Sequence, residues 1–105
     1  MLFRSDLGVS HERVGDVQRA QGALGDALES YRAGLEIAQA LAQADPSNAE
    51  WRRDVAVSLW KLADVPDSGV TWTQAADALE AMAADGVLAP ADLPALEQAR
   101  RNAGR

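Results

Sequence analysis

Hydrophobic residues recur every three or four positions along most of the chain, which is the spacing that gathers them on one side of an α-helix. The longest such stripe runs over about five helical turns and consists of Leu24, Leu28, Tyr31, Leu35, Ala38 and Leu41. A stripe before it consists of Leu7, Val14, Val17 and Gln21, and one after it of Trp51, Val55, Leu59 and Leu62. The pattern predicts an all-α protein.

Residues that end or begin helices separate these stripes. Gly22 follows the first stripe, and glycine is the usual residue just beyond a helix end. Pro46 ends the second helix, because the residue before a proline is biased away from helical geometry. Ser47 with Glu50 three residues later predicts a capping box for the third helix, and Pro66 ends that helix.

The C-terminal part continues with shorter helices. Thr71 and Gln74 form a second predicted capping box, and the helix that they open stops at Asp85 and Gly86. Prolines at positions 90 and 94 are compatible only with a helix start, so a last helix is expected to run to about residue 102. Its predicted apolar stripe consists of Leu93, Leu96, Ala99 and Ala103.

The chain also contains an internal repeat. The segment from Asp6 to Val17 aligns with the segment from Asp54 to Val65 at an offset of 54 − 6 = 48 residues. Farther on, residues 77–80 match residues 26–29 at an offset of 77 − 26 = 51. We therefore predict a single domain of stacked antiparallel helical hairpins, organised as a first hairpin (1–46), a second, degenerate hairpin (47–86) and a C-terminal capping helix (87–105).

The repeat resembles the tetratricopeptide repeat (TPR) family over roughly residues 1–65. The resemblance rests on Val14-Gly15, Gln21-Gly22, Leu24, Ala27-Leu28, Tyr31, Leu35, Ile37 and Asp45-Pro46. The sequence departs from the family pattern at His11, Gln18 and Gly34. The period of 48 also exceeds the common period of roughly 34 residues. An extra heptad in each helix accounts for the difference and turns the apolar side by only about 20°. The chain is thus similar to a long-helix variant of the family.

Composition excludes most catalytic chemistry. The 105-residue chain contains no cysteine and a single histidine, so thiolate catalysis, cysteine-ligated metals and any site that needs two histidines are excluded. His11-Glu12 begins like the zinc-protease helix motif, but Gly15 stands where the second histidine would be. The formal net charge of −6 disfavours nucleic acid and anionic membranes as partners. We expect a soluble cytoplasmic protein that is not an enzyme and has neither cofactor nor metal.

The resemblance implies a function in protein–protein interaction, as a scaffold that presents a concave surface lined by the first helix of each hairpin. The positions that face this surface in the family are occupied by Val9, Glu12, Asp16, Arg19, Val57, Trp60 and Asp64. They predict an acidic groove with an exposed Trp60, suited to a basic or amphipathic peptide. The alternative is that the carboxylates are merely solvated and that Trp60 covers helix edges.

A second hypothesis concerns assembly. The first hairpin has no polar helix cap before Phe3, so its outer side is expected to meet either earlier repeats or a second copy of the chain. A homo-oligomer would make Phe3 and Leu7 the suspected interface. The chain would then be a self-assembling structural unit or the C-terminal capping fragment of a longer TPR array.

Overall fold

The computed structural model describes the backbone of residues 3–105 and the side chains of residues 10–105. It contains five α-helices and one short 3₁₀ helix, and no strand occurs within residues 3–105. The elements are α1 (Phe3–Ala20), α2 (Leu24–Ala44), α3 (Ala49–Ala63), α4 (Trp72–Ala84), η1 (Pro90–Asp92) and α5 (Leu93–Asn102). The predicted all-α class is confirmed.

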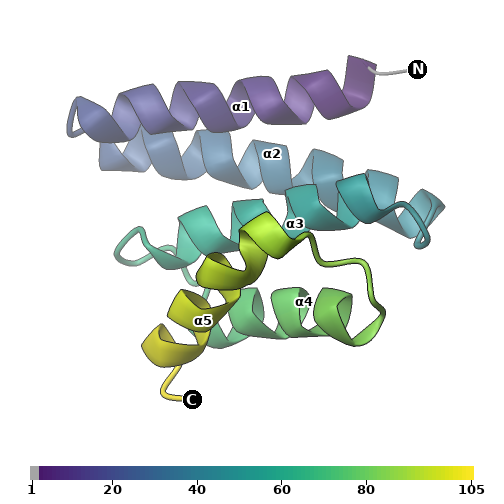
Figure 1. Ribbon diagram of the computed structural model, residues 1–105. Helices are drawn as coiled ribbons and strands as arrows, with labels where there is room; N and C mark the ends of the chain where they lie inside the picture. Colours follow the sequence, from purple (N-terminus) through teal and green to yellow (C-terminus); the bar gives the residue numbers. More distant parts are fainter. Residues whose placement is uncertain (1–2) are drawn as a thin grey trace.

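The helices pack mainly against their neighbours in chain order. Helices α1, α2 and α3 follow one another as layers of a stack, with α4 and α5 at the end opposite α1 (Figure 1). Helix α1 also contacts α3, the first helix of the next hairpin. The molecule is therefore a stack of helical hairpins in which the chain progresses from one end to the other.

Local sequence explains the helix ends, with one correction. Gly22 adopts a φ of 81° in the turn after α1, a conformation that glycine accepts without steric cost. The capping box of Thr71 and Gln74 at the start of α4 is confirmed. The capping box predicted for Ser47 and Glu50 is wrong, because Asn48 is the N-cap of α3 and its side-chain oxygen accepts a hydrogen bond from the Trp51 N–H at 3.0 Å.

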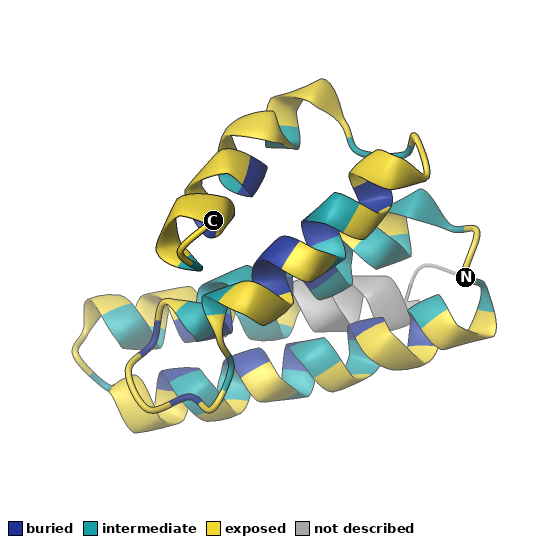
Figure 2. Cartoon of the chain, turned by 90° about the horizontal axis from the view of Figure 1, so that it is seen from below, coloured by how far each residue is buried: buried dark blue, intermediate teal, exposed yellow. Residues whose placement is uncertain are grey.

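The hydrophobic core lies in two clusters. The first joins α2 to α3 and contains the buried residues Ala27, Tyr31, Leu62 and Val65. The second joins α3, α4 and α5 and contains the buried residues Ala56, Ala76, Leu79, Met82, Leu96 and Ala99. Figure 2 shows the buried positions along the helix sides that face other helices. Both clusters involve α3, the central helix of the stack.

In the part of helix α1 whose side chains are described, the two valines of the apolar stripe are exposed. Val14 and Val17 have exposed fractions of 49% and 56%, although they carry the stripe that predicted the helix. The contact of α1 with α2 uses small and polar residues instead. A Cβ on Gly15 would lie 2.6 Å from Tyr31 Cε1, and Ser30 Oγ donates a hydrogen bond to Gln18 Oε1 at 2.7 Å. Hairpin closure therefore depends on close approach at Gly15 rather than on the valines.

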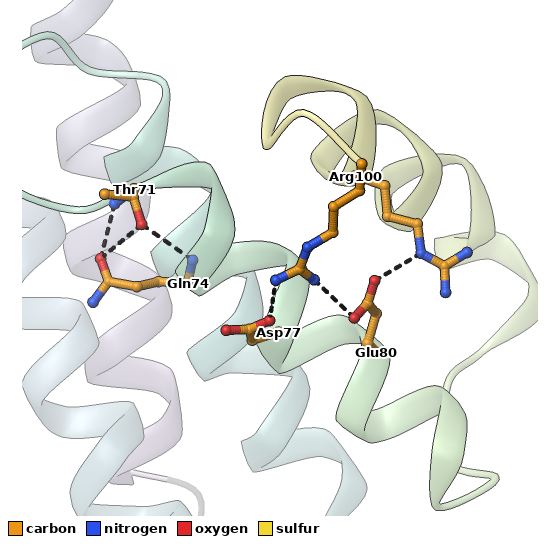
Figure 3. Close-up of polar contacts among 6 residues, drawn as sticks. Thr71, Gln74, Asp77, Glu80 and Arg100 are labelled. Carbon is orange, nitrogen blue, oxygen red and sulfur yellow. Dashed lines mark hydrogen bonds and ion pairs between the residues drawn. The ribbon is translucent and has the colours of Figure 1, made fainter.

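Helix α5 covers the other end of the stack. Its Leu96 and Ala99 are buried against α4, whereas Leu93, which the sequence pattern placed on the same stripe, is exposed. Charged pairs hold the edge of this contact (Figure 3): Arg100 donates to Glu80 at 2.8 Å, and Arg105 bridges Glu80 and Asp77. The hydrogen bond from Arg100 lowers the pKa of Glu80 below its ordinary value. Helix α5 therefore covers the apolar side of α4 at this end of the stack.

Candidate interaction surface

The side chains predicted for the groove lie on α1 and α3, the two helices that contact each other across the hairpin boundary. Residues 12, 16 and 19 recur at intervals of four and three, so Glu12, Asp16 and Arg19 lie on one side of α1. Asp64 follows the last turn of α3 at the position equivalent to Asp16. Val9, also a member of the predicted set, lies outside the side chains that the structure describes.

Each of the three acidic side chains already has a partner within the chain. Glu12 accepts a hydrogen bond at 2.7 Å from the hydroxyl of Ser58, a residue of α3 that is completely buried. A buried hydroxyl needs a hydrogen-bond partner, and this carboxylate is the partner of the Ser58 hydroxyl. The bond joins the two hairpins in the middle of their contact.

Asp16 is the centre of a cluster that joins three helices. Its carboxylate accepts a hydrogen bond from the Tyr31 hydroxyl of α2 at 2.6 Å and forms an ion pair with Lys61 of α3 at 2.9 Å. The Lys61 ammonium also lies 5.9 Å from the centre of the Tyr31 ring, within the range of a cation–π contact. One carboxylate therefore fixes the relative positions of α1, α2 and α3.

The pKa values of this cluster shift in opposite directions. Burial raises the pKa of Asp16, but the hydrogen bonds from Lys61 and Tyr31 outweigh it, and the net pKa lies below 3.8. Burial, followed by the hydrogen bond to Asp16, raises the pKa of Tyr31 to about 12. The ionised carboxylate and the neutral phenol are therefore the stable pair over a wide pH range.

A third link between the hairpins is the ion pair of Arg19 and Asp64 at 2.6 Å. The hydrogen bond to Asp64 raises the pKa of Arg19. Both side chains are more than a third exposed, so this pair closes the contact of α1 and α3 at its solvent edge. Together the three links form an interhelical polar seam, which consists of Glu12, Ser58, Asp16, Tyr31, Lys61, Arg19 and Asp64.

The two remaining residues of the predicted surface lie on α3. Val57 is half-buried, and so is Trp60, whose ring meets Trp72 of α4 edge to face with the centroids 5.1 Å apart. Trp60 packs against the α3–α4–α5 core, and its indole Nε1 is buried with no hydrogen-bond acceptor among the described residues. Only part of the Trp60 ring is therefore available to a ligand.

Sequence reasoning missed three members of the seam, namely Ser58, Lys61 and Tyr31, as partners of the acidic residues. A signal for Lys61 exists in the sequence. Lys61 and Asp64 lie one turn apart with opposite charges, and Asp16 and Arg19 lie one turn apart with the opposite order. The order of positive and negative charge on α3 is the reverse of that on α1. Both ion pairs, Lys61 with Asp16 and Arg19 with Asp64, can therefore form when the two helices lie side by side.

A hollow of about 520 Å³ lies on another side of α3. It is open to solvent and lined by Gln39, Ala42, Gln43, Pro46, Arg52, Val55 and Asp85. An ion pair of 2.9 Å between Arg52 and Asp85 joins its two sides. No sequence motif indicates this hollow, because its lining comes from α2, α3, the turn between them and the residue that follows α4.

The described part of the chain contains neither a candidate metal-binding cluster nor a candidate membrane-spanning helix. Within residues 10–105, no group of three or more His, Asp or Glu side chains could hold a metal ion. None of the helices described is both long enough and apolar enough to cross a membrane. His11, from the incomplete zinc-protease pattern, is half-buried on α1.

Fold and surface together define an all-α protein of stacked helical hairpins whose first helices are joined by a polar seam. In comparisons with known proteins, no protein-family model, no curated protein and no solved structure matches the chain.

Proposed function

We propose that this protein is a non-catalytic interaction module of the tetratricopeptide type, which binds a protein or peptide along the surface formed by α1 and α3. The observation that carries the proposal is the Asp16 cluster, which fixes α1, α2 and α3 relative to one another without any ligand. A surface that is already ordered loses less conformational entropy on binding. The proposal includes a cytoplasmic location.

The chemistry of this surface favours a cationic or amphipathic partner. The chain carries a net charge of −6, and the carboxylates of Asp16 and Asp64 are each more than 40% exposed although they are paired. A lysine or arginine of a ligand can share such a carboxylate without breaking the existing pair, because a carboxylate has four acceptor sites. Val57 and the exposed part of Trp60 supply apolar contact beside them.

A titration with a lysine-rich amphipathic helical peptide tests the proposal. Backbone amide signals of the ¹⁵N-labelled protein are followed by NMR while the peptide is added. We expect the shifted signals to lie on α1 and α3, and Asp16→Lys and Trp60→Ala each to weaken binding.

Glu29→Lys is the matched control for Asp16→Lys. It reverses the same charge at an exposed position of α2 away from the seam and is expected to leave the site of binding unchanged. Unchanged binding in both Asp16→Lys and Trp60→Ala would show that α1 and α3 do not form the binding surface.

A further inference from the structure

The outer side of the first hairpin is an exposed apolar face formed by Val14 and Val17 of α1 and Leu24 of α2. These three side chains have exposed fractions between 43% and 56%, which is unusual for large aliphatic residues at helical spacing. Successive residues of a helix are turned by about 100°, so Val14 and Val17 point away from Glu12 and Asp16. This face is therefore separate from the seam on which the proposed peptide surface is built.

The internal repeat indicates what such a face packs against. At the offset of 48, Val14 corresponds to Leu62 and Val17 to Val65. Both of those residues are buried, with exposed fractions of 0% and 3%, and both pack against α2 of the preceding hairpin. At the offset of 51, Leu24 corresponds to Ala75, which is also completely buried.

The surface that receives Leu62 and Val65 has a definite chemistry. It presents a small residue and an aromatic residue one helical turn apart, Ala27 and Tyr31, which are themselves almost completely buried. The contact between the two hairpins thus shows which residues the first helix of a hairpin packs against: a small and an aromatic residue on the second helix of the hairpin before it.

Charge gives a second, independent indication. Arg13 corresponds to Lys61, and Lys61 forms its ion pair across the hairpin boundary with Asp16. Arg13 is exposed on α1 and has no ion pair with any described side chain. A preceding hairpin with an acidic residue at the position of Asp16 would give Arg13 the same ion pair that Lys61 forms with Asp16.

We infer that the exposed face of the first hairpin is a docking surface for a further helical hairpin of the same repeat type. That hairpin carries a small and an aromatic residue at the positions of Ala27 and Tyr31, and an acidic residue at the position of Asp16. The inference does not depend on the peptide-binding proposal, because the two surfaces use different sides of α1.

A second copy of this chain does not present the required surface. Its Ala27 and Tyr31 are covered by its own α3. The equivalent positions of α4, occupied by Ala78 and Met82, are covered by α5 through the cluster that contains Leu96. Among the described residues, the packing surface of the repeat is thus exposed at α1 and covered by α5 at the other end.

The test is a fusion in which a second copy of residues 1–48 directly precedes the full chain. The added hairpin supplies Ala27, Tyr31 and Asp16 at the period of 48 residues, so it carries the partner chemistry stated above. We expect the fusion to unfold in a single transition at a higher temperature than the original chain. Amide hydrogen exchange in the original α1 is expected to slow by roughly tenfold or more, because its valines become buried.

The control carries Val14→Asp and Val17→Asp in the original hairpin only. In the unfused chain these exposed substitutions are expected to change the unfolding temperature little. In the fusion they are expected to abolish the gain in temperature and exchange protection. This difference separates docking at the face from a general effect of a longer chain.

Two results would overturn the inference. One is a fused hairpin that unfolds independently and leaves exchange in the original α1 unchanged. The other is a concentration-dependent dimer of the unfused chain, detected by light scattering, that the two aspartate substitutions dissociate. In that case the face binds a second copy of the chain instead of a further hairpin.

Discussion

The two hairpins place equivalent residues in opposite surroundings. Leu62 and Val65 of the second hairpin are buried against α2, whereas Val14 and Val17 of the first hairpin are exposed to solvent. Helix α2 does not cover Val14 and Val17, because they lie on a different side of α1. In the second hairpin the equivalent side of the first helix packs against α2 of the hairpin before it. The comparison shows that in a stacked repeat the burial of a residue depends on its neighbouring unit.

The ends of the stack differ for the same reason. At the C-terminal end, α5 covers the side of α4 that corresponds to the Tyr31 side of α2, and pairs such as Arg100 with Glu80 hold it there (Figure 3). No described element covers the outer side of α1 in this way. One end is closed by a helix of different sequence, and the other presents the repeat's own packing surface.

The largest effect is expected from truncating equivalent residues in the two hairpins. Leu62→Ala removes a completely buried side chain and is expected to lower the free energy of unfolding by about 2–5 kcal/mol. Val14→Ala is expected to change it by less than about 0.5 kcal/mol, because Val14 is half exposed. Urea unfolding followed by tryptophan fluorescence measures both. Similar losses would mean that α1 is covered in solution.

Two glycines differ in the space around them: Gly15 lies in a close helix contact, and Gly25 lies at an open surface. Gly15→Ala places a Cβ 2.6 Å from the ring of Tyr31, which is buried and cannot move aside, so a loss of about 1–3 kcal/mol is expected. Gly25→Ala meets nothing within 4 Å on α2 and is expected to stabilise the protein by about 0.4–1 kcal/mol. Thermal unfolding of both variants compares them directly. A neutral Gly15→Ala would show that α1 and α2 can separate at no cost.

The start of α3 offers a smaller effect. Asn48→Ala removes the hydrogen bond to the Trp51 N–H and is expected to cost about 1 kcal/mol. Ser47→Ala is its control, because the Ser47 hydroxyl bonds only to Asp45 in the preceding turn, and a much smaller loss is expected. Chemical denaturation of the two variants measures the difference. The reverse order would restore the Ser47 capping box that the sequence predicted.

The sequence was sufficient for the helices and their order, because apolar spacing and the turn residues act locally. Gly22, Pro46 and the capping box of Thr71 acted where they were expected to act. The cap of α3 was mispredicted by one residue, since Ser47 and Asn48 are both good N-caps and the turn geometry decides between them. The exposure of Val14 could not be predicted from periodicity, which shows that a stripe exists but not what covers it.

The sequence indicated which residues lie on the predicted surface, but not the ion pairs and hydrogen bonds that they form. The repeat offset placed Asp16 and Asp64 at equivalent positions, but it did not show that Lys61 and Arg19 neutralise them across the hairpin boundary. Such pairs depend on the stagger of α1 against α3, which the spacing within either helix does not determine. The same stagger brings Ser58 to Glu12.

The smallest expected effect on stability concerns the Asp16 cluster, and it has a distinct pH signature. The lowered pKa of Asp16 contributes stability above pH 3.8, which is lost as the pH falls through the lower pKa of the folded state. The raised pKa of Tyr31 contributes stability below pH 10, which is lost as the pH rises from 10 toward about 12. Between these limits the cluster is fully formed. Asp16→Asn is expected to cost at most about 1 kcal/mol at neutral pH, because half of the side chain is exposed and screened by solvent.

Tyr31 is the only tyrosine in the chain, so its ionisation can be followed without interference by the ultraviolet absorbance of tyrosinate. The midpoint is expected near pH 12 in the original protein. In Asp16→Asn it is expected to fall but to stay above 10, because burial, the larger cause of the shift, is retained while the charged acceptor is lost. Glu29→Gln on the same helix as Tyr31 is the matched control and is expected to leave the midpoint unchanged. A midpoint that Asp16→Asn does not lower would show that the Tyr31 hydroxyl does not bond to Asp16 in solution, and α2 would then be held against α1 by other contacts, such as the close approach at Gly15.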